Sequence, residues 1–151
     1  MIDAIDRKIL QLVQRNNQLT STEISDQVGL SSTSVQRRLQ RLRTSKVIEA
    51  DVAIVSPAAA ERPLTMLVAV ELARERSDII DRFKRAVRER AEVMSAYYVT
   101  GETDFVLIVS AEDMAGYEAF TRDFFYNNTD IKGFKTTVVM DRIKASFNLP
   151  L

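Results

Sequence analysis

SSTSVQRRLQRLR, residues 31–43, is the stretch that decides how the N-terminal part of this chain folds. Its apolar residues Val35, Leu39 and Leu42 recur at helical spacing, which predicts a helix with one buried face. The remaining positions of the stretch hold four arginines among uncharged polar residues, and no acidic residue. Because the whole chain balances 21 basic against 21 acidic residues, this positive charge is local. A local basic helix on a neutral chain predicts a contact with a polyanion.

Two shorter helices are predicted N-terminal to this stretch. The first has its apolar residues at helical spacing and two aspartates in its first turn. The second begins with a capping-box pattern, Thr20 and Glu23. It ends at Gly29, because glycine adopts the left-handed conformation at a helix end without steric cost. Ser31 or Ser32 can then cap the third helix. A helix, a tight glycine turn and a basic helix predict a helix-turn-helix motif.

The side of the third helix opposite its apolar stripe carries groups that suit DNA. Arginine can form paired hydrogen bonds with guanine and glutamine with adenine, and both can hold phosphates. A solvated basic face without a partner is the alternative interpretation of such a charge run. The preceding helix, the glycine turn and the lack of acids all favour double-stranded DNA as the partner. The predicted DNA-contacting residues are Ser32, Thr33, Ser34, Gln36, Arg37, Arg38, Gln40 and Arg41.

The C-terminal part of the chain has a different order of elements. After Pro57 and Pro63 the periodicities predict strand, helix, two strands, helix and a last strand over residues 134–144. This βαββαβ order is that of the ferredoxin-like split unit. The expected fold class is therefore α+β, with an N-terminal helix-turn-helix domain and a C-terminal ferredoxin-like domain. Two helices cover only one face of such a sheet, so the open face predicts a homo-oligomer.

The expected domain boundaries follow from these patterns. We assign residues 1–50 to the helix-turn-helix domain, 51–63 to a strand linker or hinge, and 64–151 to the C-terminal domain. The segment KVIEADVAIV, residues 46–55, is rich in valine and isoleucine. It predicts a strand, which would be either the wing of a winged helix or a connector.

The composition excludes several classes of site. The chain has no histidine and no cysteine, which argues against zinc sites and against Ser-His or Cys-His catalysis. No acids stand at a spacing typical of catalysis, so we predict neither an enzyme, nor a metal site, nor a bound cofactor. The lack of a signal peptide and of an apolar run long enough for a bilayer predicts a cytoplasmic protein with no membrane partner. With the predicted DNA contact, we expect it to be nucleoid-associated.

The loop VTGETDF, residues 99–105, joins the two central strands and has two possible interpretations. In the first it is a plain hairpin loop, with Gly101 at positive φ and Thr103 or Asp104 bonded to local backbone. In the second, Gly101 exposes backbone N–H groups to a small anion and Asp104 accepts hydrogen bonds from a ligand ammonium group. The pattern by itself favours the hairpin.

Five segments occur in an order that resembles the leucine-responsive/asparagine-responsive (Lrp/AsnC) family of transcription regulators, also called feast/famine regulatory proteins. They are IDRKIL, VGLSSTSVQRRLQRL, VIEADVAIVSP, VTGETDFVLIV and TTVVMDRIK. The resemblance runs from about Asp3 to Lys144. Two departures are local: residues 16–18 are Asn-Asn-Gln in place of an Asp-Gly-Arg type turn, and Lys46 stands where a glycine usually follows the recognition helix.

The resemblance implies that the C-terminal domain senses a small molecule, usually an amino acid. It also implies that the sheets pair into dimers, which assemble further, for example into octamers. The effector would bind between dimers beside the loop, with Asp104 holding its amino group and the Gly101 region its carboxylate. With the family in view, an effector site is preferred to a bare hairpin. The implied effector-binding residues are Tyr98, Gly101, Thr103, Asp104, Thr136 and Thr137.

The leading hypothesis is a sequence-specific transcription regulator that binds DNA as a symmetric oligomer and responds to an amino-acid effector. One alternative keeps the DNA binding without the effector, so that the C-terminal domain only oligomerises and the protein is architectural. Another is an amino-acid-binding regulatory domain without DNA binding, against which the basic helix weighs. The effector, the operator, the direction of regulation and the oligomeric state stay open at this stage.

Overall fold

The computed structural model describes residues 2–151, which divide into two compact units. The helical unit contains the chain up to Ile54 together with Ile143–Leu151, and the sheet unit is Val55–Arg142. The chain therefore leaves the helical unit, forms the sheet unit and returns to the helical unit. This division differs from the one we expected from the sequence, which placed all of residues 64–151 in one domain.

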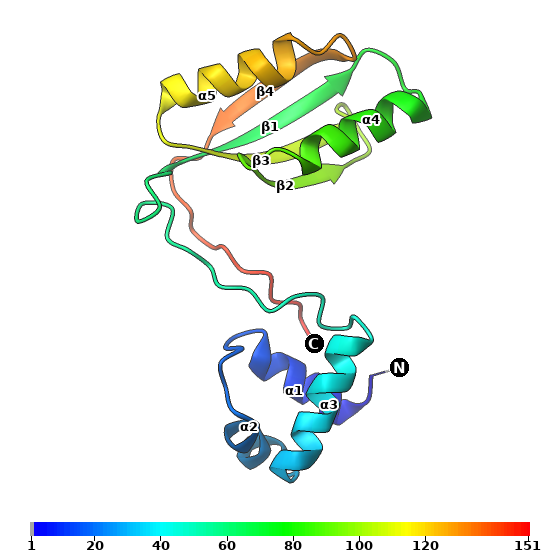
Figure 1. Cartoon of the computed structure of the whole chain (residues 1–151), viewed down its shortest axis with the longest axis vertical. Coiled ribbons are helices and arrows are strands. Elements are labelled where there is room, and N and C mark those ends of the chain that lie inside the picture. The colour runs from blue at the N-terminus through cyan, green and yellow to red at the C-terminus, as the bar shows by residue number, and fades with distance from the viewer. Residues whose placement is uncertain (1) are drawn as a thin grey trace. The chain divides into compact units, whose positions relative to one another are not determined.

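Three helices form the helical unit (Figure 1). They are α1 (Ala4–Val13), α2 (Ser21–Val28) and α3 (Ser32–Thr44). At the start of α2 the Thr20 hydroxyl accepts the Glu23 N–H and the Glu23 carboxylate accepts the Thr20 N–H, so the predicted capping box is confirmed. Gly29 ends α2 at a φ of +72°, and the Ser31 hydroxyl caps α3. The predicted helix-turn-helix motif is confirmed.

The core of the helical unit comes from the apolar stripes of the three helices. The predicted stripe of α3 is buried, and it packs against apolar residues of α1 and α2. The fully or nearly fully buried residues are Ile9, Leu10, Val13, Ile24, Val35, Leu39 and Leu42.

Residues 143–151 belong to the helical unit, and within them Leu149 and Leu151 bind α1 and the residue that follows it. The Gln14 amide donates to the Leu149 carbonyl (2.8 Å) and accepts the Leu149 N–H (3.0 Å). Gln11 donates to the carbonyl of Leu151, and the Leu151 side chain packs against the apolar core. This pairing of one glutamine amide with a backbone could not be inferred from periodicity, which does not report contacts between distant segments.

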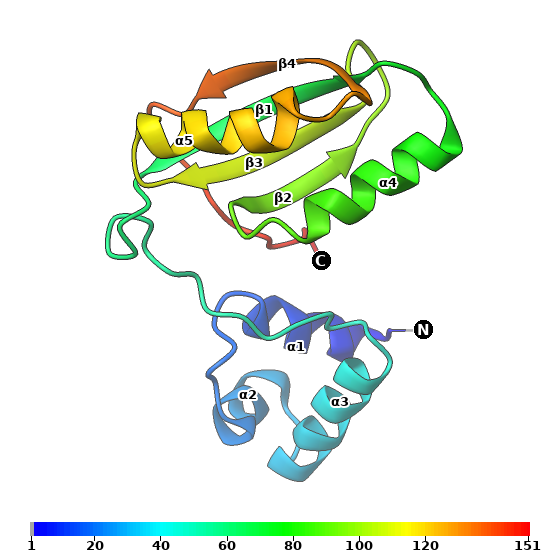
Figure 2. The same ribbon diagram turned by 45° about the horizontal axis from the view of Figure 1, so that its top comes forward.

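The sheet unit has the predicted βαββαβ order. Its elements are β1 (Leu64–Leu72), α4 (Ser77–Arg88), β2 (Val93–Tyr98), β3 (Phe105–Ala111), α5 (Met114–Thr121), η1 (Arg122–Tyr126) and β4 (Ile131–Val138). The strands form one antiparallel sheet in the order β2-β3-β1-β4. Helices α4 and α5 lie on the same face of the sheet (Figure 2), and η1, a π-helix, follows α5 directly.

The central strands alternate between a buried face and an open one. Met66, Val68 and Val70 of β1 have no exposed surface and pack against the helices. The residues between them point to the open face, where Leu67 lies beside Ile108 of β3. Leu67 is exposed to 41%, and other apolar side chains of this face are partly exposed. The expected open face is therefore present.

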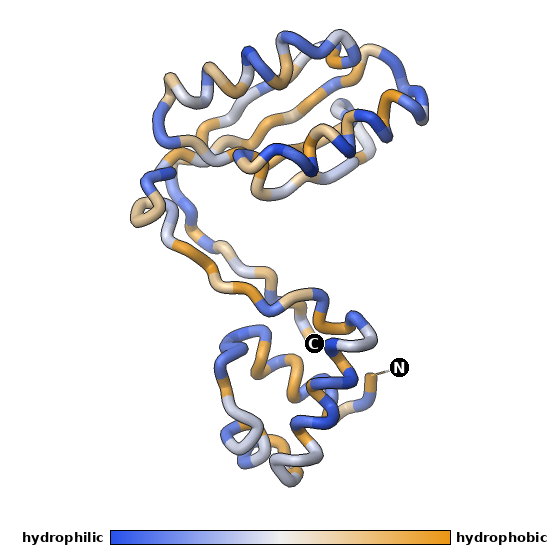
Figure 3. Tube along the Cα trace, in the orientation of Figure 1, coloured by the Kyte–Doolittle hydropathy of each residue, from blue (hydrophilic) through white to orange (hydrophobic). Residues whose placement is uncertain are grey.

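The segment expected to be a strand before the sheet unit has no regular secondary structure. No strand occurs between Thr44 and Leu64, so within the described chain there is neither a wing nor a strand linker, and this expectation was wrong for the single protomer. A strand needs a neighbour for its backbone groups, and this chain provides none here. The apolar side chains of this connector are nevertheless accessible. Val52, Ile54 and Val55 are all exposed, and part of the connector is coloured hydrophobic in Figure 3.

The last strand starts earlier and ends earlier than its sequence pattern suggested. We expected it over residues 134–144, whereas β4 ends at Val138. β4 pairs only with β1, whose own first residue is Leu64, so the ladder runs out soon after Val138 meets Met66. Apolar residues beyond this point have no strand to join.

Lys46 adopts the left-handed conformation that its position after α3 demands, with a φ of +58°. Left-handed backbone costs a non-glycine residue about 1–2 kcal/mol, and glycine loses about 0.5–1 kcal/mol of entropy on folding, so Lys46→Gly should stabilise the protein by about 0.5–1 kcal/mol. Chemical denaturation measures this free energy of unfolding. Lys46→Ala is the matched control, since it removes the same charge but keeps Cβ; equal stabilisation by both variants would contradict the backbone explanation.

Candidate DNA-binding helix and effector loop

The exposed side of α3 carries most of the residues predicted to contact DNA. Ser31 lies at the start of the helix and its hydroxyl also bonds the Ser34 hydroxyl (2.9 Å), which is thereby engaged within the first turn. Arg38 is only partly exposed, as are Ser32 and Ser34. The predicted residues with exposed side chains are Thr33, Gln36, Arg37, Gln40 and Arg41.

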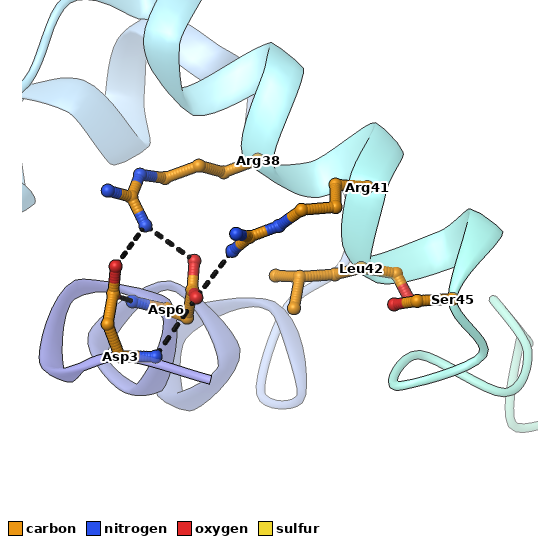
Figure 4. A network of polar contacts seen from close by, with 6 residues as sticks. All are labelled: Asp3, Asp6, Arg38, Arg41, Leu42 and Ser45. Carbon is orange, nitrogen blue, oxygen red and sulfur yellow. Dashed lines mark hydrogen bonds and ion pairs between the residues drawn. The ribbon is translucent and has the colours of Figure 1, made fainter. Parts of the chain in front are cut away.

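Two of the predicted arginines form ion pairs with the start of α1 (Figure 4). One Arg38 nitrogen, Nη1, lies 2.7 Å from Asp3 Oδ2 and 2.8 Å from Asp6 Oδ1. Arg41 Nη2 lies 2.5 Å from Asp6 Oδ2. Asp6 has no exposed surface, whereas the Arg38 and Arg41 side chains are exposed to 23% and 51%. A buried carboxylate thus joins α1 to two arginines one turn apart on α3.

The surroundings of both aspartates keep them ionised. Burial pushes the pKa of Asp6 upward, but the Asp3 N–H together with the Arg38 and Arg41 guanidinium groups outweighs it, so the pKa lies below its ordinary value. For Asp3 the Asp6 N–H is the main cause of a lowered pKa, followed by Arg38. The two acids also form the capping box of α1 with each other's backbone. The carboxylates therefore serve the helix end and the arginines together.

The positive charge of α3 is smaller than its sequence suggests. Arg43 forms a bidentate ion pair with Asp51, in which its Nε lies 2.8 Å from Oδ2 and its Nη2 3.1 Å from Oδ1. Four guanidinium groups on this stretch face three paired carboxylates, which leaves a local balance of +1. Arg37 takes part in none of the ion pairs found over residues 2–151. It is exposed, so it is the guanidinium most available to a phosphate or a base.

Asp6 is the residue of this site that sequence reasoning missed. The two aspartates were interpreted only as favourable charges at a helix N-terminus. A signal was nevertheless present: Asp6 occupies the same helical stripe as Ile9, Leu10 and Val13, all of which are buried. An acid on a buried stripe requires a cationic partner, because an unpaired buried charge is strongly unfavourable.

The loop between β2 and β3 is held to the end of β1 by its own side chains. The Thr103 hydroxyl donates to the Val70 carbonyl (2.6 Å), and Asp104 Oδ2 accepts the Leu72 N–H (2.7 Å). Leu72 lies where the pairing of β1 with β4 shifts register. Gly101 is exposed and has a φ of +124°, which a residue with a side chain rarely adopts. The local bonding that we considered for a plain hairpin is present only as a longer contact of the Thr103 hydroxyl with the Phe105 carbonyl (3.3 Å), whereas the shorter bonds of Thr103 and Asp104 go to β1.

The two threonines predicted near the loop lie on opposite faces of the sheet. Thr136 pairs with the buried Val68 and Thr137 with the half-exposed Leu67. On the covered face, the Thr136 hydroxyl forms a hydrogen bond with the hydroxyl of Tyr117 from α5. The two threonine side chains therefore do not line one pocket within a single protomer.

Tyr98 lies on the edge strand, beside a shallow groove next to α4. Its ring centre is 5.0 Å from that of Phe105 and 4.9 Å from the Lys84 ammonium nitrogen. The groove is lined by residues of α4 and β2 together with Phe105, and neither Gly101 nor Asp104 belongs to its lining. The structure of one protomer therefore does not gather all six predicted effector residues around one cavity.

Two further findings limit the kinds of site over residues 2–151. No group of three or more acidic side chains is close enough together to hold a metal ion. None of the helices is long and apolar enough to cross a membrane.

Comparison with known proteins agrees with this architecture. Residues 2–43 match the AsnC-type helix-turn-helix domain, and residues 65–149 match the Lrp/AsnC ligand-binding domain. The chain belongs to the Lrp/AsnC family of transcription regulators. The identification made from the sequence segments is thereby confirmed, and this Lrp/AsnC protein is a transcriptional regulator with a helix-turn-helix domain and a ligand-binding domain.

Individual relatives of this Lrp/AsnC regulator cover nearly its whole length. The HTH-type transcriptional regulator y4tD of Sinorhizobium fredii is 62% identical over 150 residues, which is 99% of this chain and 89% of that protein. The leucine-responsive regulatory protein of Haemophilus influenzae is 32% identical, over 96% of this chain and 87% of its own. Among solved structures, the transcriptional regulator NMB0573 of Neisseria meningitidis, in complex with L-Met, has a TM-score of 0.92 and 31% identity, over 99% of this chain and 97% of its own.

Removing the buried carboxylate should lower stability in a pH-dependent way. Asp6→Asn is expected to reduce the free energy of unfolding at pH 7 by about 1.5–3 kcal/mol, since charge-assisted hydrogen bonds are lost. The pKa of Asp6 is lowered in the folded state, so its contribution is fully present above its ordinary pKa of 3.8 and is lost as the pH falls through the folded value. Chemical denaturation should therefore show the difference between the two proteins shrinking below about pH 4.

The matched control for this pH series is Asp26→Asn, which removes an exposed acid from α2. It should shift stability by less than about 0.5 kcal/mol at pH 7. A difference between wild type and Asp6→Asn that stays constant down to pH 2 would show that the Asp6 carboxylate makes no ionised contact of this kind.

Proposed function

We propose that this regulator binds double-stranded DNA through α3 of paired helix-turn-helix units and that an amino acid binding at the loop of residues 99–105 modulates it. The observation that carries the DNA part is the outer face of α3, which is exposed, uncharged or basic, and free of acidic residues over its whole length. The effector part rests on the ligand-binding domain match and on the loop geometry.

The exposed residues of α3 divide into those that suit bases and those that suit phosphates. Thr33 and Gln36 lie in the N-terminal half, which is the half a recognition helix presents to base edges. Glutamine matches the edge of adenine, and the unpaired Arg37 suits guanine or a phosphate. Gln40 and the half-exposed Arg41 follow one turn later and suit the backbone. The set has the charge and spacing that reading a major groove requires.

A symmetric oligomer would place two such helices on one duplex. The open face of the sheet presents Leu67 and Tyr97 with about half of each side chain exposed, and Val52, Ile54 and Val55 are exposed on the connector. Apolar surface of this kind marks a protein interface. A second copy of the chain would cover both regions and supply the missing neighbour for the connector. We propose a dimer through these surfaces and further assembly, for example to an octamer.

At the loop, the polar groups suit an amino acid. Asp104 uses Oδ2 for the Leu72 N–H, so Oδ1 is the oxygen we propose for the ligand ammonium group. Gly101 leaves the backbone accessible for a carboxylate, because there is open space where its Cβ would be, with nothing within 4 Å. Its φ of +124° would strain any residue with a side chain at this position. The L-Met complex of the Neisseria protein supports an amino acid as the ligand class. Tyr98, Thr103, Thr136 and Thr137 complete the proposed set, with contributions from more than one protomer.

The loop also favours a second candidate function. Thr103 and Asp104 are both bonded to β1, so the loop holds its shape without any ligand. An architectural DNA-binding protein, whose C-terminal unit serves only to assemble the oligomer, is consistent with this geometry. Ligand binding distinguishes the two.

Arg37→Ala should weaken DNA binding and flatten its salt dependence. Each lost phosphate contact reduces the slope of log K against log salt by about 0.9. The measurement is fluorescence anisotropy at several salt concentrations, using a duplex selected from random sequence by the wild-type protein. Arg122→Ala, which removes an exposed arginine from the sheet unit, should leave the slope unchanged. Unchanged affinity and slope in Arg37→Ala would remove α3 as the DNA-contacting helix.

A thermal-shift panel of the twenty amino acids should find an effector whose binding depends on Asp104. At one hundred times its dissociation constant, a ligand of the folded state adds about 2.7 kcal/mol of stability. Asp104→Asn is the sharper variant, because the amide oxygen can still accept the Leu72 N–H while the charge needed for an ammonium group is gone. The expected result is a shift that this variant abolishes.

The matched control for the panel is Glu102→Gln, which removes an exposed charge from the same loop and should keep the shift. A shift that survives Asp104→Asn would place the effector elsewhere. No shift with any of the twenty would favour the architectural function.

A further inference from the structure

We propose that Asp6 is a positioning residue for DNA recognition: it withdraws Arg38 from the DNA-facing side of α3 and holds Arg41 by one nitrogen, so that specificity rests on the uncharged residues and Arg37. The inference rests on the proposed contact between α3 and DNA. It concerns a residue of α1, which lies outside the recognition helix.

The first step is the state of Arg38. Its Nη1 lies between two carboxylates, at 2.7 Å from Asp3 and 2.8 Å from Asp6, and less than a quarter of the side chain is exposed. A phosphate would have to replace both carboxylates to bind this nitrogen. Because Asp6 is fully buried, it cannot turn away to release the arginine.

The second step is the state of Arg41, one turn further along α3. Only Nη2 is bound to Asp6, at 2.5 Å, and about half of the side chain is exposed. A guanidinium group has five N–H donors in a rigid fork, so several remain for a phosphate. Asp6 therefore fixes the direction in which Arg41 points and leaves it able to bind DNA. Figure 4 shows both arginines reaching Asp6 from neighbouring turns of α3, with Arg38 also reaching Asp3.

The consequence for recognition is electrostatic. Contacts between cations and phosphates supply sequence-independent affinity, whereas contacts with base edges supply specificity. A freely mobile Arg38 beside Arg37 and Arg41 would raise binding to every duplex. Holding Arg38 on α1 lowers this background, so that the contacts of Thr33 and Gln36 with bases decide which sequence is bound. The acids thereby favour specific over non-specific binding.

The experiment compares Asp6→Asn with wild type on two duplexes, the selected one and an unrelated one of equal length. In this variant Arg38 keeps only Asp3, whose side chain is half exposed and can be displaced by a phosphate. Release of Arg38 should steepen the slope of log K against log salt by about 0.9, the value for one new phosphate contact. Affinity for the unrelated duplex should rise, and the ratio of specific to non-specific affinity should fall. A merely structural role for Asp6 would weaken binding to both duplexes and would not steepen the slope.

Asp26→Asn provides the matched control, because it changes the net charge equally from an exposed position on α2 that takes part in none of the ion pairs within residues 2–151. Its slope and ratio should equal those of wild type. If the control steepens the slope as much as Asp6→Asn, net charge and not release of Arg38 is responsible, and the proposal fails.

Arg38→Met keeps the test decisive even if Asp6→Asn does not fold. An arginine withdrawn from DNA can be replaced with no change in slope, whereas loss of a phosphate contact would reduce the slope by about 0.9. A reduced slope in Arg38→Met would overturn the proposal while α3 remained the DNA-binding helix. Absence of DNA binding by wild type would instead overturn the proposed function itself.

Discussion

The buried carboxylate of Asp6 is the constraint on which the helical unit depends. It has no exposed surface, so folding must provide it with partners, and the partners are two arginines of α3 and the backbone at the start of α1. These contacts hold the start of α1 in a fixed position against α3. The same contact decides which arginines of α3 remain available. Under the proposed contact of α3 with DNA, stability and recognition are linked at a single side chain.

In the sheet unit, too, one carboxylate of the loop can serve two partners. Thr103 and Asp104 hold the loop to the end of β1, at the point where the pairing of β1 with β4 shifts. A carboxylate that already serves a strand end keeps one oxygen for another partner. A ligand bound there would act directly on β1, the strand that pairs with both β3 and β4. This position suits a sensor, because β1 is central to the apolar core of the unit.

Much of the fold could be predicted because its signals are local. Capping by Thr20 and Ser31, the left-handed Gly29 and the alternation along β1 depend on neighbours in the sequence, and all were found as expected. The boundaries of β4 and the state of the connector were not predicted correctly. Strand ends depend on the length of the partner strand, and a strand in the connector would need a neighbouring strand, which the described residues of one protomer do not provide. The docking of residues 149–151 on α1 likewise involves segments far apart in the chain.

For the candidate sites, too, local features could be predicted from the sequence, whereas contacts between distant segments could not. By itself the sequence determined which face of α3 is polar, where the glycine turns fall and which family the chain belongs to, because periodicity, turn chemistry and segment order are properties of the chain alone. Only the tertiary structure decided that three of the four arginines are paired with aspartates, that Thr136 and Thr137 face opposite sides of the sheet, and that Asp104 already bonds β1. The physical reason is that a charge or a hydroxyl acquires its role from the groups that surround it, and those groups come together only when distant segments pack.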